Sequence, residues 1–338
     1  LLASYKINTF HFHFSDDEAW RLEIPGLEEL TSVGAHRGFT RDESQCLYPN
    51  YYGGWNPADT TATANGYYTR QDFIDLLQYA ASRHITVIPE IESPGHARAA
   101  IVAMKARYNR LKDSDPEGAK EYLLSEKADT SKYVCHKAYT DNVMNVSLPS
   151  VYRFMEKVSD EIIAMYREAG VPLAAIHIGG DEVPHGSWEG SPSCQRFMKE
   201  QGMTDPHQLA EHFLDQVSAM LAGKGVKVSG WQEVALNHSP ELNARIAPRF
   251  DGVYCWRTTG RSDIIPYTVA NDGYGVILCN VSNFYLDLAY NSHKDEPGLI
   301  WGGYVDQFAS YNMLPYNIYC SARTDMAGNP KNLKKAHQ

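Results

Sequence analysis

Short β-rich runs alternate regularly along the chain with longer segments of helical periodicity. The β-rich runs recur at 7–14, 85–91, 173–180, 226–231, 251–256 and 274–280. Segments with apolar residues three or four positions apart lie between several of them, at 69–84, 150–170 and 205–225. Thr69, with Asp72 three residues later, predicts the start of the first segment, and Gly170 predicts the end of the second. Strands that alternate with helices pair in parallel through right-handed crossovers. The pattern therefore predicts an α/β fold.

Two parallel-sheet folds fit this pattern, an open doubly wound sheet and a closed (β/α)8 TIM barrel. No G-x-G-x-x-G motif follows the first run, which weakens the dinucleotide-binding form of the open sheet. All six runs end in or lead into acids, amides, His or Trp, and in a barrel these strand ends share the face that holds the active site. We therefore predict a (β/α)8 barrel. Six runs are too few for eight strands, so we expect an incomplete barrel whose first strand precedes Leu1 and whose last follows Gln338.

The domain organisation is predicted to be simple. The chain has no internal repeat and no low-complexity linker, so we expect one catalytic domain over residues 1–338. Two long irregular stretches, 38–68 and 114–142, interrupt the alternation. Loops of this length are usually functional or disordered, and we expect both insertions to lie over the functional face.

Charge and composition exclude several classes of protein. The formal net charge of −10 argues against a protein that binds a nucleic-acid backbone, which needs a basic surface. No apolar run is long enough to span a membrane. The six cysteines form no C-x-x-C pair, so a zinc ribbon or a dithiol redox motif is not indicated.

The stretch IHIGGDEVP, residues 176–184, places two adjacent acids at the end of a predicted strand. Neighbouring side chains of a strand point to opposite faces, so Asp181 and Glu182 can serve one site only if the backbone bends. Gly179 and Gly180 permit such a bend, because glycine tolerates backbone angles that other residues resist. An isolated acid pair is more often a solvated strand end, but the preceding HIGG favours a functional site.

Other polar residues also follow predicted strands. His96 comes after a Pro-Gly turn in SPGHA, close in sequence to Glu90 and Glu92. Asp16 and Asp17 close the first run. A lone histidine is more often structural than catalytic, but this one lies where the barrel hypothesis places the active face.

An alternating histidine pair supports a rival hypothesis. His11 and His13 share one face of the first run, and a His-x-His on an early barrel strand is how amidohydrolase-type enzymes hold a divalent metal. Later runs should then end in further histidine ligands. They end instead in Trp231, Trp256 and Asn280, which disfavours the metal hypothesis.

Aromatic residues gather near strand ends and indicate a sugar-binding pocket. Trp231, Trp256 and Trp301 lie at or beyond these ends, and Tyr285 precedes Asp287 by two residues. Aromatic walls with a few placed polar groups are the general form of a small-molecule site. Here they would pack against the apolar faces of a sugar ring.

Four segments together resemble glycoside hydrolase family 20, the β-N-acetylhexosaminidases. They are KINTFHFHFSDDEAWRLEI, YYTRQDFIDLLQYAASRHITVIPEIESPGH, IHIGGDE and YLDLAY…EPGLIWGGYVD. The resemblance covers about residues 1 to 320 in the family's order and spacing, and HIGGDE with PEIESPGH is a highly specific pair. Residues 126–158 are further similar to the bacterial chitobiase branch.

The resemblance implies a role for each matching residue. Glu182 is implied to be the general acid/base, and Asp181 to orient the 2-acetamido group of the substrate. That group attacks the anomeric carbon and forms an oxazolinium intermediate, an exception to the scheme with two enzyme carboxylates. Asp16 and His96 are implied to lie behind Glu182 and to influence its protonation. The remaining implied contacts are the acetamido-pocket walls Trp231 and Trp256, the acetamide donor Tyr285, the distal-hydroxyl contact Asp287, the pocket residue Trp301, and supporting residues His177 and Glu92.

The function implied by the resemblance is an exo-β-N-acetylhexosaminidase that releases terminal β-linked GlcNAc or GalNAc with retention, without a metal or cofactor. Its partner would be an N-acetylhexosamine-terminated oligosaccharide or glycoconjugate, and its location the periplasm or exterior of a bacterium. We expect the Arg and Trp that the family carries on its first and last strands to lie outside residues 1–338. The alternatives are a non-catalytic sugar-binding protein on the same scaffold and the metal-dependent enzyme using His11 and His13.

Overall fold

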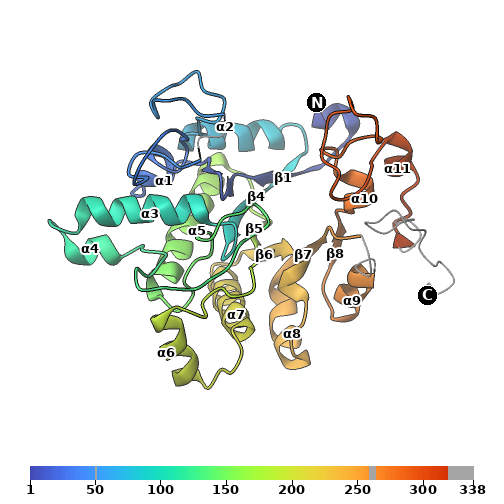
Figure 1. Cartoon of the computed structure of the whole chain (residues 1–338). Helices are drawn as coiled ribbons and strands as arrows, with labels where there is room; N and C mark the ends of the chain where they lie inside the picture. The colour runs from blue at the N-terminus through green and yellow to red at the C-terminus, as the bar shows by residue number, and fades with distance from the viewer. Residues whose placement is uncertain (50–51, 259–263, 319–338) are drawn as a thin grey trace. The chain divides into compact units, whose positions relative to one another are not determined.

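The computed structural model describes residues 1–49, 52–258 and 264–318 (Figure 1). Contacts within the chain divide it into two compact units, Leu1–Ser229 and Gly230–Gln338, and each is described by itself. Among the described residues, no helix has both the length and the apolar character needed to cross a membrane.

The first unit is built on parallel strands. β1 (Thr9–His13), β4 (Thr86–Ser93), β5 (Ala175–Gly179) and the beginning of β6 (Lys227–Trp231), up to Ser229, lie side by side in that order (Figure 1). The predicted runs 7–14, 85–91, 173–180 and 226–231 each contain one of these strands. Two further strands, β2 (Ser15–Asp16) and β3 (Ala19–Trp20), form a small antiparallel pair directly after β1.

The helices of the first unit follow the predicted periodicity. They are α1 (Glu29–Ser32), α2 (Arg70–Ala81), α3 (Arg98–Leu111), α4 (Pro116–Lys120), α5 (Pro149–Ala169), α6 (Pro192–Gln201) and α7 (His207–Gly223), with a 3₁₀ turn at Leu2–Tyr5. The predicted start of α2 is confirmed, because Thr69 and Asp72 form a capping box. The predicted stop of α5 is confirmed as well, because Gly170 takes the left-handed conformation that ends the helix.

One face of β1 packs into an aromatic core. Phe12 contacts Phe14 and, on α2, Phe73, with ring centroids 5.9 and 6.0 Å apart. Phe14 also lies 5.8 Å from the fully buried Trp20. Phe side chains therefore fill the core on one side of the strand, and this leaves the alternating His11 on the other side, next to β5.

The described residues of the second unit include two parallel strands and several short helices. β7 (Phe250–Cys255) pairs with β8 (Val276–Leu278), so the last two predicted runs also contain strands. The helices are α8 (Pro240–Ile246), α9 (Ile265–Asn271), α10 (Val281–Phe284) and α11 (Gln307–Tyr311), with 3₁₀ turns η2 (Gln232–Ala235) and η3 (Ala247–Arg249). Val281, Leu288 and Val305 form a buried cluster that packs α10 against the chain that follows it.

Both predicted insertions are largely irregular. Within 38–68, the described residues form isolated bridges and turns, and Arg98 of α3 anchors the stretch by donating to the Tyr48 carbonyl at 3.0 Å and to Glu43 at 2.9 Å. Stretch 114–142 contains one short helix, α4. Arg98 is the first residue of α3 and lies two residues after His96 in the chain. Its hydrogen bonds therefore hold the first insertion close to that histidine.

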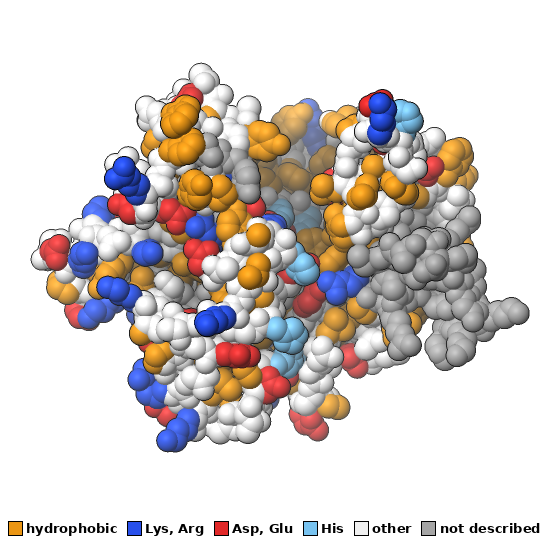
Figure 2. Space-filling model, in the orientation of Figure 1, with side chains coloured by type: hydrophobic (Ala, Val, Ile, Leu, Met, Phe, Trp, Pro, Cys, Tyr) orange, Lys and Arg blue, Asp and Glu red, His pale blue; other side chains and the backbone are white. Residues whose placement is uncertain are grey.

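The visible surface carries charges of both signs. On the face that Figure 2 shows, Lys and Arg side chains are interspersed with Asp and Glu, and the coloured part of that face has no continuous basic stripe.

Candidate active site

The adjacent acids at the end of β5 lie on a bend of the predicted kind. Gly179, Gly180 and Glu182 have φ angles of +71°, +90° and +48°, so the chain passes through the left-handed region three times in four residues. As a result, both acids reach the same imidazole. His96 Nε2 lies 3.7 Å from Asp181 Oδ2 and 3.3 Å from Glu182 Oε2. The two glycines therefore bring neighbouring side chains to one place.

Gly179 also has no room for a side chain. An added Cβ would lie 2.0 Å from Glu92 Oε2, and its φ of +71° is strained for any other residue. Gly179→Ala should therefore destabilise the protein by about 1–2 kcal/mol through strain and about 1–3 kcal/mol more through overpacking. The matched control is Gly170→Ala, which has a φ of +68° but nothing within 4 Å. Denaturant unfolding that gives the two variants equal stability would contradict the steric explanation.

His96 is the centre of a carboxylate cluster. Its Nδ1 lies 2.9 Å from Asp17 Oδ2 and 3.5 Å from Asp16 Oδ1, and its side chain is only 4% exposed. Burial favours the neutral imidazole, but hydrogen bonds to Asp16, Asp17 and Glu182 outweigh it and raise the pKa of His96 well above its ordinary value. The ring is therefore an imidazolium that faces carboxylates at both nitrogens.

Asp16 is held ionised by two cations. Burial opposes its ionisation, but the hydrogen bond from His96 and the charge of Lys137 hold its pKa well below the ordinary value. Lys137 Nζ contacts Asp16 Oδ1 and lies 3.4 Å from Glu18 Oε2. Asp17 accepts a further hydrogen bond at 3.1 Å from Asn142. The aspartates are thus fixed by partners on two separate segments, the turn that carries His96 and the 114–142 insertion.

The lowered pKa of Asp16 makes a pH-dependent contribution to stability. Because the folded-state pKa lies below the unfolded one, the contribution is present above the ordinary value of 3.8 and disappears as pH falls through the folded value. Asp16→Asn should therefore cost about 2 kcal/mol at pH 6, with a smaller difference from the unmodified protein at pH 3. Unfolding free energies at the two pH values test this, and a constant difference would contradict it.

Behind the cluster lies a buried carboxylate with imidazoles at both oxygens. Glu90 Oε2 is 2.8 Å from His11 Nε2, and Glu90 Oε1 is 2.9 Å from His177 Nδ1. Burial disfavours the charge, but these imidazoles, with His13, keep the pKa of Glu90 low. Burial and the charges of Glu90 and Asp16 instead raise the pKa of Glu92 well above its ordinary value. His177 and Glu92, the two predicted supporting residues, therefore both lie in this buried layer around Glu90.

The same geometry bears on the metal hypothesis. His11 and His13 do share a face of β1, and both approach Glu90. Two groups of potential ligand atoms result, His11 with Glu90 and His177, and His13 with Glu90 and Glu92. Among the described residues, no such group contains both histidines. The His-x-His pair therefore does not form the joint ligand set that the hypothesis requires.

The second unit brings three of the predicted aromatic residues together. Trp256 and Tyr285 stack with centroids 6.5 Å apart, and Trp301 lies edge-on to them at 6.0 and 5.8 Å. Trp256 is buried, whereas Trp301 is 41% exposed, so the cluster is open on one side. Trp231 lies at the end of β6, edge-on to Tyr254 at 5.9 Å. Asp287, two residues beyond Tyr285, is exposed.

Trp256 is oriented by polar contacts that the sequence did not predict. Its backbone N–H donates to Gln232 Oε1 at 3.1 Å, and its indole N–H donates to Glu233 Oε2 at 3.3 Å. The Arg257 guanidinium lies 4.7 Å from the centre of its ring system. These contacts fix the indole plane, which a wall for a sugar ring requires.

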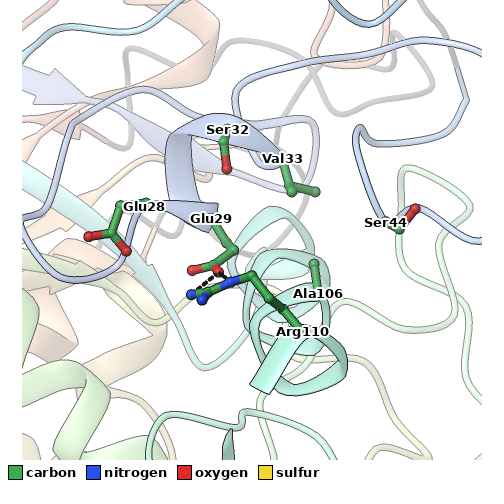
Figure 3. Close-up of a pocket in the computed structure, with 7 residues that line it drawn as sticks. All are labelled: Glu28, Glu29, Ser32, Val33, Ser44, Ala106 and Arg110. Carbon is green, nitrogen blue, oxygen red and sulfur yellow. Dashed lines mark hydrogen bonds and ion pairs between the residues drawn. The ribbon is translucent and has the colours of Figure 1, made fainter. Parts of the chain in front are cut away.

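A separate hollow of about 550 Å³ lies between α1 and α3 (Figure 3). Its lining residues are Glu28, Glu29, Ser32, Val33, Ser44, Ala106 and Arg110. None of them is a predicted site residue, and its one basic residue is paired, since Arg110 Nη2 lies 2.6 Å from Glu29 Oε1. The carboxylate cluster around His96 is therefore the better candidate site.

Comparison with known proteins shows which family the chain belongs to. A sequence model described as glycosyl hydrolase family 20, catalytic domain, matches residues 1–333. The chain belongs to glycosyl hydrolase family 20. It is 36% identical to a β-hexosaminidase of Vibrio vulnificus over 322 residues, which cover 94% of this chain and 37% of that protein. It is also 36% identical to an N,N'-diacetylchitobiase of Vibrio harveyi, covering 96% of this chain and 40% of that protein.

A solved structure from the same family is also similar to this chain. The crystal structure of a family 20 exo-β-N-acetylglucosaminidase from Vibrio harveyi, in complex with N-acetylglucosamine, matches with a TM-score of 0.75 at 35% identity. The match covers 93% of this chain and 43% of that one. The chain thus spans about two fifths of the length of these relatives. The family assignment and the (β/α) barrel fold class are confirmed, and the single-domain organisation stays a prediction.

The structure places further residues beside the candidate site that the sequence did not predict. Asp17 lies closer to His96 than the predicted Asp16 does, at 2.9 against 3.5 Å. His136 and Lys137, both in the 114–142 insertion, contact Glu182 and Asp16. An irregular insertion has no periodicity from which such contacts could be derived. Asp17 could have been found, because it is adjacent to Asp16 on a tight turn.

Proposed function

We propose that this chain carries the catalytic residues of an exo-β-N-acetylhexosaminidase, which releases terminal β-linked GlcNAc or GalNAc with retention of configuration. The observation that supports this most directly is the convergence of Asp181 and Glu182 on His96. The two acids would act on neighbouring groups of one sugar. Glu182 would protonate the glycosidic oxygen, and Asp181 would orient the acetamido group on the neighbouring carbon.

In the first step, Glu182 gives its proton to the glycosidic oxygen while the acetamido oxygen attacks the anomeric carbon. The bond to the leaving group breaks, and an oxazolinium ring forms. Asp181 accepts the acetamido N–H hydrogen bond and stabilises the positive charge of the ring. In the second step, Glu182 removes a proton from water, which opens the ring at the anomeric carbon. Each step inverts the configuration at the anomeric carbon, so the two steps together retain it.

His96 would act as a positioning residue in both steps. Its protonated Nε2 faces Glu182 Oε2, and its other nitrogen is held by Asp17 and Asp16. This arrangement fixes the plane of the Glu182 carboxyl group. His177 and Glu92 would support the cluster from the buried layer around Glu90.

The contacts to the sugar are assigned to the predicted aromatic residues and Asp287. We assign Trp231 and Trp256 to the walls of the acetamido pocket, Tyr285 to the acetamide oxygen, and Asp287 to distal hydroxyls, with Trp301 as a further pocket residue. The stacked arrangement of Trp256, Tyr285 and Trp301 supports this assignment. The mechanism needs no metal or cofactor. The bacterial relatives support a bacterial protein, and we propose a periplasmic or secreted location.

The deciding experiment measures turnover of a chromogenic N-acetyl-β-glucosaminide by the full-length protein, together with binding of a thiazoline mimic of the intermediate. We expect both hydrolysis and binding, and unchanged hydrolysis after exhaustive chelation. Binding without hydrolysis would identify a sugar-binding protein on the same scaffold. Hydrolysis lost on chelation and restored by a divalent metal would support the metal-dependent alternative.

A further inference from the structure

One residue to which the resemblance assigned no role lies directly beside the proposed general acid. His136 Nε2 is 3.6 Å from Glu182 Oε1, and the His136 side chain is 73% exposed. Glu182 therefore lies between two imidazoles that differ in their exposure to solvent. The one at Oε2, His96, is buried among carboxylates, whereas the one at Oε1 faces solvent.

The position of the catalytic proton follows from the contacts of His96. A protonated imidazole donates at both nitrogens. Nδ1 faces Asp17, so the Nε2–H is directed at Glu182 Oε2. Because Oε2 accepts this charged hydrogen bond, the acid form of Glu182 holds its own proton on Oε1. That is the oxygen beside His136.

This assignment places the leaving group. A general acid must lie about 2.6–3.2 Å from the atom that it protonates. The glycosidic oxygen therefore has to sit next to Oε1, and a group 3.6 Å from Oε1 borders it. The leaving sugar departs into solvent, and His136 is the exposed side chain at this oxygen.

The segment that carries His136 is anchored on both sides. The backbone N–H of Cys135 donates to the Tyr139 carbonyl at 2.8 Å, and that of Ala138 donates to the Cys135 carbonyl at 2.9 Å. Cys135 and Tyr139 are buried, while Lys137 is tied to the aspartate cluster. His136 is thus held at the tip of a fixed turn, and little ordering would be needed to bind a ligand there.

We propose that His136 is a specificity-determining residue, which hydrogen-bonds a hydroxyl of the departing sugar and so favours sugar leaving groups over small ones. This inference rests on the proposed function. It assigns the 114–142 insertion the task of recognising the leaving group, while the sugar that reacts is recognised elsewhere.

The test compares two substrates with the same reacting sugar, chitobiose and N-acetylglucosaminyl fluoride, in the full-length protein. For His136→Ala we expect kcat/KM on chitobiose to fall about five- to tenfold, the effect of one hydrogen bond. The value for the fluoride should change less than about twofold, because fluoride offers no hydroxyl to bind. His136→Gln, whose amide can donate and accept, should restore part of the loss on chitobiose.

The matched control is Lys132→Ala, which removes an exposed side chain of the same insertion and should change neither value. Equal losses on both substrates, or an unchanged value on chitobiose, would overturn the inference while leaving the proposed function intact. An unmodified protein that hydrolyses neither substrate would overturn the proposed function itself.

Discussion

Replacing Glu182 with glutamine should lower kcat/KM on chitobiose by about 10²–10⁴-fold, the usual contribution of a general acid. The amide keeps the shape of the side chain and can still accept the hydrogen bond from His96, but it has no proton to give to the leaving group. The loss should be smaller for N-acetylglucosaminyl fluoride in the first step, because fluoride leaves without full protonation. Steady-state rates on both substrates measure the difference.

The control for this variant is Glu189→Gln, which alters an exposed carboxylate seven positions further along the chain and should leave both rates unchanged. Turnover of chitobiose at the normal rate by Glu182→Gln would remove Glu182 from its assigned role. Unfolding measurements on the same sample show whether a slow variant is still folded.

Asp181→Asn should also slow the reaction severely, by about 10²–10³-fold, the range seen when one stabilising group is removed from a developing charge. The reason differs from that for Glu182. Without the carboxylate, the acetamido group is poorly oriented and the oxazolinium charge loses its counter-ion. Attack by that group is needed whichever leaving group departs, so chitobiose and the fluoride should lose rate by similar factors.

The two variants are therefore distinguished by their dependence on the leaving group. The thiazoline mimic adds a second measurement, because its ring stands for the intermediate and should bind Asp181→Asn more weakly than the unmodified protein. If Asp181→Asn lost activity only on chitobiose, the assignment of the acetamido group to Asp181 would be wrong.

Local sequence patterns were sufficient for much of the secondary structure. The capping box at Thr69 and Asp72 and the left-handed Gly170 lie at the predicted helix ends, because such signals act within a few residues. The bend at Gly179 and Gly180 was predicted for the same reason. Boundaries were less well predicted. The run 274–280 contains only a three-residue strand, since pairing with a neighbour, and not composition, decides where a strand ends.

Periodicity and short motifs were enough to predict the alternation of strands and helices and to locate Asp181, Glu182 and His96. The groups that contact these three residues depend on the three-dimensional arrangement of the chain. Asp17 and His96 are 79 residues apart, and His136 approaches Glu182 from an insertion without periodicity. Contacts of this kind depend on how strand ends and loops come together in space and on which way each side chain points. A one-dimensional pattern records neither, so the partners of the catalytic acids became visible only in the folded chain.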